Sequence, residues 1–212
     1  GFKEDGQVIG SKHDPEANMW LNPQSWAVIS GLATKEQAEA ALESVHRELN
    51  TKYGVRVMAP SYVDHAFDGA MASTKENGGI FSQPQGWIIL AESLMGHGNR
   101  AYEYFTESSP ASQNDNADVR RLEPYVHGQF TESVESPFEG RSHVHWLTGT
   151  ASTVMVGCVE GICGMRPDFD GLTIAPSIPS AWDGFKIEKN FRGKKLNITI
   201  DNSAHVESGV AK

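Results

Sequence analysis

The spacing of hydrophobic residues predicts helices in the first part of the chain, most clearly over residues 34–49. Apolar residues recur there every three or four positions and form one stripe, while charged residues occupy the opposite face. Thr34 followed by Gln37 makes a capping box, in which the two residues bond each other's backbone N–H groups. The stripe consists of Ala38, Ala41, Leu42, Val45 and Leu49.

A shorter helix is predicted just before this one, over residues 22–32. Trp26, Ile29 and Leu32 recur at helical spacing. Asn22 suits the N-cap and Pro23 suits the first helical position, because proline lacks only an N–H group that would be unpaired there. The two predicted helices follow each other closely and therefore form a helical hairpin.

A second hairpin and a further helix are predicted beyond residue 84. The first helix of this hairpin runs from Pro84 to Met95 and ends at residues 96–98, where glycine suits a C-cap. Asn99 then caps the next helix, which carries Ala101, Tyr102 and Phe105. The further helix spans residues 149–164.

Polar connections and strands make up the rest of the chain. Residues 51–80 contain an expected short strand at 55–58, and residues 108–142 form a second long connection. After residue 166 apolar and polar residues alternate at the strand period. We therefore expect two domains, residues 1–165 and 166–212. The predicted strands of the second domain are 171–176, 185–189 and 195–201.

Helical hairpins separated by long loops are typical of a solenoid or of an α/α barrel. A solenoid needs a repeat of fixed length, and this sequence contains none. A barrel gathers its long loops at one end, where a pocket forms. The pattern therefore favours a mainly α fold, part of an α/α barrel followed by a small antiparallel β-sheet domain. The hairpins are fewer than the six of a complete barrel, so we expect a fragment.

Composition narrows the range of partners for the 212 residues. The formal net charge of −9 disfavours nucleic acid and anionic membranes as partners. The sequence has no run of 18 apolar residues, and its polar N-terminus does not resemble a signal peptide. Cys158 and Cys163 lie within one helical pattern, which argues against a disulfide or zinc framework. A reducing compartment, the cytoplasm, is therefore expected.

One stretch suggests an anion site. Thr148, Gly149 and Thr150 precede the apolar run of the last helix. The unpaired N–H groups and positive dipole end of a helix start favour an anion such as phosphate. The alternative is an ordinary capped core helix, because most capped helix starts bind nothing.

Other candidate chemistry is weaker. His143 and His145 would share one face of a strand, but no third ligand has a recognisable spacing, so no metal site is expected. Gly157, Gly161 and Gly164 suit close helix packing better than nucleotide binding, because no strand precedes them in a Rossmann pattern. No cofactor is expected.

Seven short motifs, taken together, resemble one family. Their order and their residues are similar to those in the C-terminal part of the cellobiose and related β-glucoside phosphorylases, glycoside hydrolase family 94. Any single motif is weak, but seven in sequence are specific, and they span nearly the whole chain. They are residues 22–27 (NPQSWA), 75–81 (KENGGIF), 86–87 (GW), 96–102 (GHGNRAY), 123–126 (EPYV), 146–151 (WLTGTA) and 176–185 (PSIPSAWDGF).

The resemblance implies the fold and the reaction. Residues 1–165 would be the second half of an (α/α)6 catalytic barrel, and residues 166–212 the start of a C-terminal β-sheet domain. The family cleaves a β-glucosidic bond with inorganic phosphate and inverts the anomeric centre, giving α-glucose 1-phosphate. Its general acid is an aspartate in a Trp-Asn-Asp type motif, which this sequence lacks. The acid is therefore expected upstream, and the isolated chain is expected to be inactive.

The resemblance also implies a phosphate site at Thr148, Gly149 and Gln83. Thr148 would donate its hydroxyl and Gly149 its backbone N–H. Gln83 stands where the family has a phosphate-binding histidine. A glutamine amide donates a hydrogen bond but brings no charge, so phosphate binding is expected to be weaker.

The sugar-binding residues implied by the resemblance are Lys75, Glu76 and Gln129. Without the resemblance, Lys75 and Glu76 would be interpreted as part of an exposed turn. Gln129 would be interpreted as a loop residue that forms hydrogen bonds with nearby backbone groups. Trp146 would pack on a sugar face or lie buried in the core. The expected partners are a β-glucodisaccharide or oligosaccharide and phosphate, with a homodimer as the assembly common in the family. Two alternatives stay open: a non-catalytic carbohydrate-binding remnant, and the tail of a cyclic β-1,2-glucan synthase.

Overall fold

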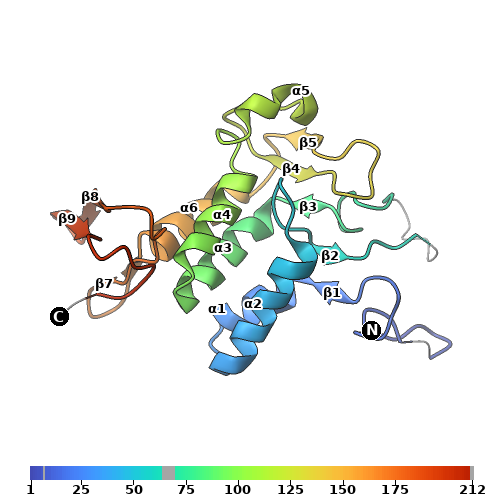
Figure 1. The fold of residues 1–212 in the computed structure, drawn as a ribbon, viewed down its shortest axis with the longest axis horizontal. Coiled ribbons are helices and arrows are strands. Elements are labelled where there is room, and N and C mark those ends of the chain that lie inside the picture. Colours follow the sequence, from blue (N-terminus) through green and yellow to red (C-terminus); the bar gives the residue numbers. More distant parts are fainter. Residues whose placement is uncertain (7, 64–69, 211–212) are drawn as a thin grey trace.

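The computed structural model describes residues 1–6, 8–63 and 70–210 (Figure 1). Its first hairpin consists of α1 (Leu21–Ile29) and α2 (Lys35–Leu49). The capping box at Thr34 is confirmed, with Gln37 N donating to Thr34 Oγ1 at 3.3 Å and Thr34 N donating to Gln37 Oε1 at 2.9 Å. The apolar stripe is buried at Ala38, Leu42, Val45 and Leu49.

The predicted start of α1 is wrong. The helix begins at Leu21 after Trp20, so Asn22 is not the N-cap, and Leu32 lies beyond the helix end with 86% exposure. A tertiary contact decides the start. β1 (Met19–Trp20) pairs antiparallel with β2 (Met58–Ala59), and Leu21 N donates to Val57 O at 2.9 Å. The predicted strand at residues 55–58 therefore overlaps β2 only at Met58.

The second hairpin consists of α3 (Gln83–Met95) and α4 (Gly98–Ser108). Gly96 ends α3 with a φ of 85°, which confirms the predicted C-cap. Asn99, however, is already inside α4 and does not cap it. Instead, its backbone N donates to Glu207 Oε2 at 2.9 Å, so a carboxylate from the chain's end satisfies this helix start.

The last predicted helix is divided in two. Residues 150–156 form α6 (Thr150–Val156), and the chain continues as a π-helical segment, Gly157–Ile162. α3 is central, because it contacts α1, α4, α6 and the π-helical segment. The main core lies between α1, α2, α3, α4 and the π-helical segment.

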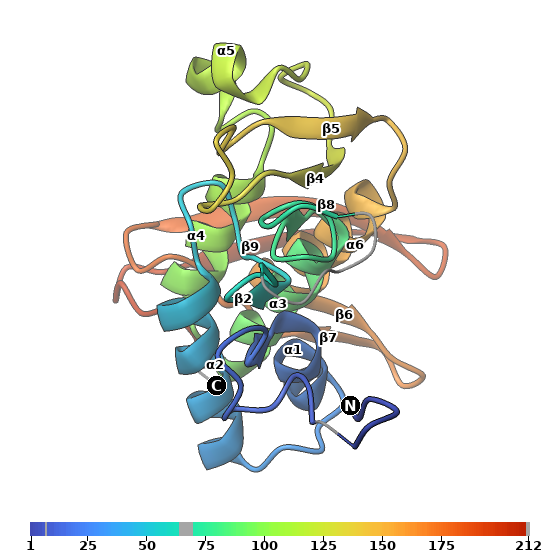
Figure 2. The same ribbon diagram turned by 90° about the vertical axis from the view of Figure 1, so that its right-hand side faces the viewer.

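The polar connection at residues 108–142 contains structure that the hydrophobic pattern does not predict. It holds a 3-10 turn (Asn114–Asn116), α5 (Ala117–Arg120) and β4 (Gly128–Thr131), and it leads into β5 (Ser142–His145). β4 pairs with both β5 and β3 (Ile80–Phe81) in an antiparallel sheet of order β3-β4-β5. In Figure 2 the β4–β5 hairpin and α5 lie together at one end of the molecule, above the helices.

The alternating pattern after residue 166 correctly predicts strands. β6 (Met165–Pro167) pairs with β7 (Leu172–Ile174), and β8 (Gly184–Phe191) pairs with β9 (Lys194–Asp201), both antiparallel. The expected combination of helical hairpins with small antiparallel sheets is therefore present. In Figure 1 β7–β9 lie on one side of the helices and β1–β5 on the other.

Short strands lead into the three helices α1, α3 and α6. β1, β3 and β5 precede them, and the long connections lie at the same side as these strands (Figure 1). The candidate site residues are gathered at this side, because they sit in β4, in the turn before β3 and at the starts of α3 and α6.

Candidate functional site

Gln83 and Gly149 meet where two helices begin. Gln83 is the first residue of α3 and Gly149 immediately precedes α6. A Cβ atom placed on Gly149 would lie 3.5 Å from both Cδ and Nε2 of Gln83. In addition, Thr153 Oγ1 donates to the Gln83 carbonyl oxygen at 2.9 Å. The structure thus brings together two of the three predicted phosphate residues.

Close contact between the two helices depends on Gly86. A Cβ atom there would lie 2.2 Å from the carbonyl carbon of Thr153, so only glycine lets α3 approach the backbone of α6 this closely. The motif Gly86-Trp87 therefore has a packing role that keeps Gln83 beside Gly149.

Thr148 forms part of the start of α6. Its Oγ1 lies 2.5 Å from Thr150 Oγ1 and accepts a hydrogen bond from Thr150 N at 3.2 Å. Thr148 is half-buried, whereas Gly149 is exposed. The hydroxyl group thus accepts from the first N–H of the helix, whereas the N-cap position is Gly149, which has no side chain that could cap it.

Gln129 lies next to this pair of helix starts. It is in β4, and its carbonyl oxygen accepts a hydrogen bond from Ser82 N at 2.9 Å, directly before Gln83. One predicted sugar-binding residue therefore lies next to the predicted phosphate residues.

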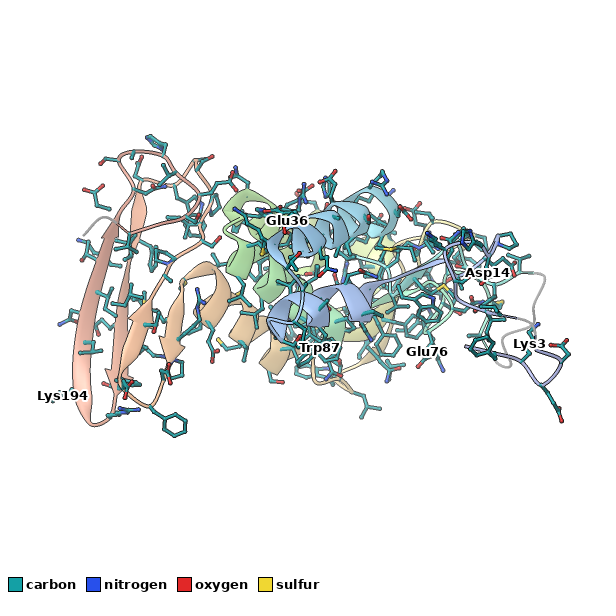
Figure 3. All side chains as sticks on the ribbon, turned by 90° about the horizontal axis from the view of Figure 1, so that it is seen from below. Lys3, Asp14, Glu36, Glu76, Trp87 and Lys194 are labelled. Atoms are coloured by element: carbon teal, nitrogen blue, oxygen red, sulfur yellow. The ribbon has the colours of Figure 1, made fainter. Side chains whose placement is uncertain are left out.

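Lys75 and Glu76 occupy the tip of the turn formed by residues 73–79. Both are exposed, while Ser73, Thr74 and Asn77 of the same turn are buried. Figure 3 shows Glu76 at the edge of the molecule. The turn comes before β3, and Gln83 comes shortly after β3. Within the described residues, no hydrogen bond joins Lys75 or Glu76 to Gln83, Gln129 or Thr148.

Trp146 is not a core residue, so the buried alternative is wrong. Its side chain is 69% exposed and its φ is 66°, an uncommon value for a bulky residue. Its ring lies 6.2 Å from that of Tyr125, which is 74% exposed. Trp146 stands two residues before Thr148 in the chain, with the Tyr125 ring beside it.

His143 and His145 lie on β5 as expected, but each has its own carboxylate. His143 Nε2 is 2.6 Å from Glu132 Oε1, and His145 Nδ1 is 3.3 Å from Glu123 Oε2. Within residues 1–6, 8–63 and 70–210 no group of three or more histidine, cysteine or acidic side chains could hold a metal ion.

Both cysteines have free thiols. Burial raises the pKa of the Cys158 thiol to about 11, and the nearby Cys163 adds to this, so little thiolate forms at neutral pH. Neither thiol is therefore suited to nucleophilic chemistry. No helix in the described ranges is long and apolar enough to cross a membrane.

Two residues near the turn at 73–79 escape prediction from the sequence. Arg56 is buried, with 5% exposure, and its Nη2 donates to Glu135 Oε1 at 2.6 Å. These residues are 79 positions apart, and neither belongs to a recognisable motif. Nothing in the local pattern signals that they pair.

Two family models match adjacent parts of the chain. The model described as "Glycosyl hydrolase 94 superfamily, catalytic domain" matches residues 1–164. The model described as "Glycosyl hydrolase family 65, C-terminal domain" matches residues 165–209.

Similar curated proteins span several activities. The chain is 35% identical to N,N'-diacetylchitobiose phosphorylase of Vibrio furnissii, over 99% of this chain and 27% of the relative. It is 33% identical to cellobionic acid phosphorylase of Neurospora crassa, over 94% of this chain and 26% of the relative. A cyclic beta-(1,2)-glucan synthase of Rhizobium meliloti is 29% identical over 96% of this chain but 8% of its own length.

The chain spans about a quarter of the length of the two phosphorylases. The first family model, in contrast, covers well over half of the chain. The chain therefore belongs to the glycosyl hydrolase 94 superfamily.

Proposed function

We propose that this chain supplies phosphate- and sugar-binding groups to an inverting phosphorylase. The whole protein would cleave a β-glucosidic bond with inorganic phosphate and release α-glucose 1-phosphate. The observation that carries the proposal is the contact between Gln83 and Gly149, with Thr148 beside them, where α3 and α6 begin. The phosphorylases among the similar proteins support it.

Phosphorolysis needs a held phosphate and an acid. Phosphate is already an anionic nucleophile, so no base has to activate it, whereas the leaving sugar oxygen needs a proton. The Thr148 hydroxyl, the Gly149 N–H and the Gln83 amide would donate to the phosphate. We assign the acid to an aspartate outside this chain, and expect no turnover from the chain alone.

On the sugar side we assign Lys75, Glu76 and Gln129. Charged and amide side chains suit sugar hydroxyls, which present both donors and acceptors. Trp146 adds an exposed aromatic face near the same helix start. The similar phosphorylases differ in the sugar that they are named for, so the proposal stays with a β-glycoside of unspecified linkage.

The architecture that goes with this function is half of a barrel. We propose that residues 1–165 are the second half of an (α/α)6 catalytic barrel and residues 166–212 the start of a β-sheet domain. We also propose a cytoplasmic protein, from the two free thiols, and a homodimer, from the family.

A second candidate is the corresponding segment of a cyclic glucan synthase, which the match to the Rhizobium meliloti protein favours. In that case the chain would bind a β-1,2-glucan in preference to a phosphorylase's disaccharide. Titration of the chain with a β-1,2-glucan oligosaccharide and with cellobiose, followed by NMR, separates the two candidates.

Phosphate titration followed by amide NMR tests the proposed site. Phosphate should shift the amide signals of residues 148–152, and Thr148→Val should weaken that response. Thr199→Val, in β9, is the matched control and should respond like the wild-type chain. Unchanged signals at residues 148–152 under saturating phosphate would refute the site.

A further inference from the structure

The turn at residues 73–79 is held in place by groups distant in the sequence. Arg56 Nε donates to the Gly78 carbonyl oxygen at 3.1 Å, and Arg56 Nη2 donates to both carboxylate oxygens of Glu135, at 2.6 and 2.5 Å. Arg56 thus joins the C-terminal side of the turn to Glu135.

Glu135 joins the same cluster to the N-terminal side of the turn. Ser73 Oγ donates to Glu135 Oε2, and Glu135 N donates to Ser73 Oγ at 3.0 Å. Ser61 bridges the two sides, because its Oγ accepts from Ser73 N at 3.1 Å and from Arg56 Nη2 at 3.0 Å. The Arg56–Glu135 pair therefore contacts both ends of one short turn.

The turn has an unusual backbone that needs a glycine at position 78. Gly78 has a φ of 79°, and a Cβ atom on it would lie 2.0 Å from Ser61 Oγ and 2.9 Å from Arg56 Nη2. Ser73 and Lys75 also have positive φ values, 63° and 45°, which non-glycine residues seldom adopt. Such conformations persist where the surroundings over-determine them.

The charges in the cluster are matched. Burial alone would raise the pKa of the Glu135 carboxyl, but hydrogen bonds from Ser73 and Arg56 outweigh it and hold that pKa below its ordinary value. Glu135 is therefore ionised at neutral pH. Removing its charge would leave the buried Arg56 guanidinium without its carboxylate partner.

What the cluster leaves exposed is the tip of the turn. Lys75 and Glu76 are solvent-exposed, whereas Ser73, Thr74 and Asn77 are buried. We propose that the Arg56–Glu135 pair is a positioning element of the sugar subsite, which sets where Lys75 and Glu76 meet the glucosyl ring. This inference rests on the proposed function.

Glu135→Gln is the central variant, because it keeps the side chain's size while removing its charge. Amide hydrogen exchange in residues 74–79 should accelerate, whereas α2 and α3 should exchange as in the wild-type chain. Binding of glucose 1-phosphate should weaken roughly tenfold, since small misplacements of binding groups have large effects, while binding of inorganic phosphate should change less than about twofold. Ser73→Ala should act in the same direction, and Glu135→Asp should restore part of the binding.

Glu43→Gln is the matched control. It breaks another Arg–Glu pair, in which Arg100 Nη2 donates to Glu43 Oε2 at 3.0 Å between α4 and α2. The control should alter neither exchange in the turn nor binding of either probe. Equal weakening of both probes by Glu135→Gln would indicate general destabilisation and overturn the proposal.

The exchange measurement separates this inference from the proposed function. If the wild-type chain binds neither probe, the proposed function fails for the isolated chain, and the sugar-positioning role fails with it. If both probes bind to the wild-type chain and Glu135→Gln changes neither exchange nor sugar affinity, the positioning role alone is wrong.

Discussion

Gln83 decides how strongly the proposed site can hold an anion. A neutral amide hydrogen bond contributes about 1 kcal/mol, against roughly 1.5–3 kcal/mol for one with a charged donor. Gln83→His should therefore bind anions more tightly than the wild-type chain, by roughly fivefold, once the imidazole is protonated. The gain should appear as the pH falls through about 6.5, the ordinary pKa of histidine.

Sulfate is the suitable probe, because it does not titrate in this range as phosphate does. Calorimetric titration with sulfate at pH 5.5 and pH 8 measures the effect. Gln83→Ala serves as control, and should bind more weakly than the wild-type chain without a new pH dependence. A gain for Gln83→His that is the same at both pH values contradicts the role assigned to residue 83.

Glu107, near the end of α4, should make stability depend on pH. Burial raises the pKa of its carboxyl to about 7; a hydrogen bond from Asn50 opposes this effect and the charge of Glu103 adds to it. The folded-state pKa lies above the unfolded value near 4.5. The contribution of Glu107 to the stability of the fold is therefore fully present below pH 4.5, the unfolded-state pKa, and is lost as the pH rises through 7.

Glu107→Gln removes this titration. The difference in free energy of unfolding between this variant and the wild-type chain should grow by about 1–2 kcal/mol from pH 5 to pH 8, in favour of the variant. This is less than the full pKa shift implies, because the carboxyl is partly exposed. Urea unfolding at the two pH values measures it. Glu188→Gln on β8, where the carboxylate is exposed, should show no such trend.

The resemblance to a family groups three residues that are far apart in the chain, and the structure places them close together, while their binding role stays a prediction. Gln83 and Gly149 meet, and Gln129 lies beside them. The Arg56–Glu135 pair shows the limit. Its partners are 79 residues apart, and a single charged residue in a short strand or a polar loop looks like a solvated charge.

At the scale of elements, the contact between α3 and α6 depends on one missing side chain. A Cβ atom on residue 86 would meet Thr153 backbone atoms at 2.2 and 2.3 Å, and backbone atoms cannot turn aside as flexible side chains do. Gly86→Ala should therefore separate the helix starts and destabilise the fold by about 2–3 kcal/mol, as overpacking does.

The same variant should reduce the phosphate response of residues 148–152, because Gln83 moves away from Gly149. Thermal unfolding and phosphate titration are the two measurements. Gly171→Ala is the control, since a Cβ atom there would meet no neighbour within 4 Å. Wild-type phosphate binding by Gly86→Ala would show that the α3–α6 contact does not shape the site.

Elements with a strong local pattern were predictable, and so were the start of α2 and the end of α3, whereas other ends were not. The stripe and capping box give α2 correctly, and alternation gives β8 and β9. The starts of α1 and α4 depend instead on Val57 and Glu207, which approach only in the folded chain. β3, β4 and β5 have two to four residues each, too short for a periodic signal, so the sheet beside the site escaped prediction.

At the scale of the whole molecule, binding and turnover should separate. The donors assigned to phosphate meet within this chain, and these contacts require no acid. The leaving sugar, by contrast, must be protonated, and general acid catalysis contributes typically about 10²–10⁴-fold to the rate. The Trp-Asn-Asp type context of the family's acid is absent from the 212 residues.

The isolated chain, incubated with phosphate and either cellobiose or N,N'-diacetylchitobiose, should therefore release no measurable sugar 1-phosphate, although phosphate shifts the NMR signals of residues 148–152. A coupled enzymatic assay for glucose 1-phosphate and phosphorus NMR for the N-acetylated product follow the two reactions. Product formed by the wild-type chain and lost in Thr148→Val would place a working acid within these residues and overturn the division proposed here. Binding without product would mean that this part of the molecule holds the nucleophile while another part supplies the proton.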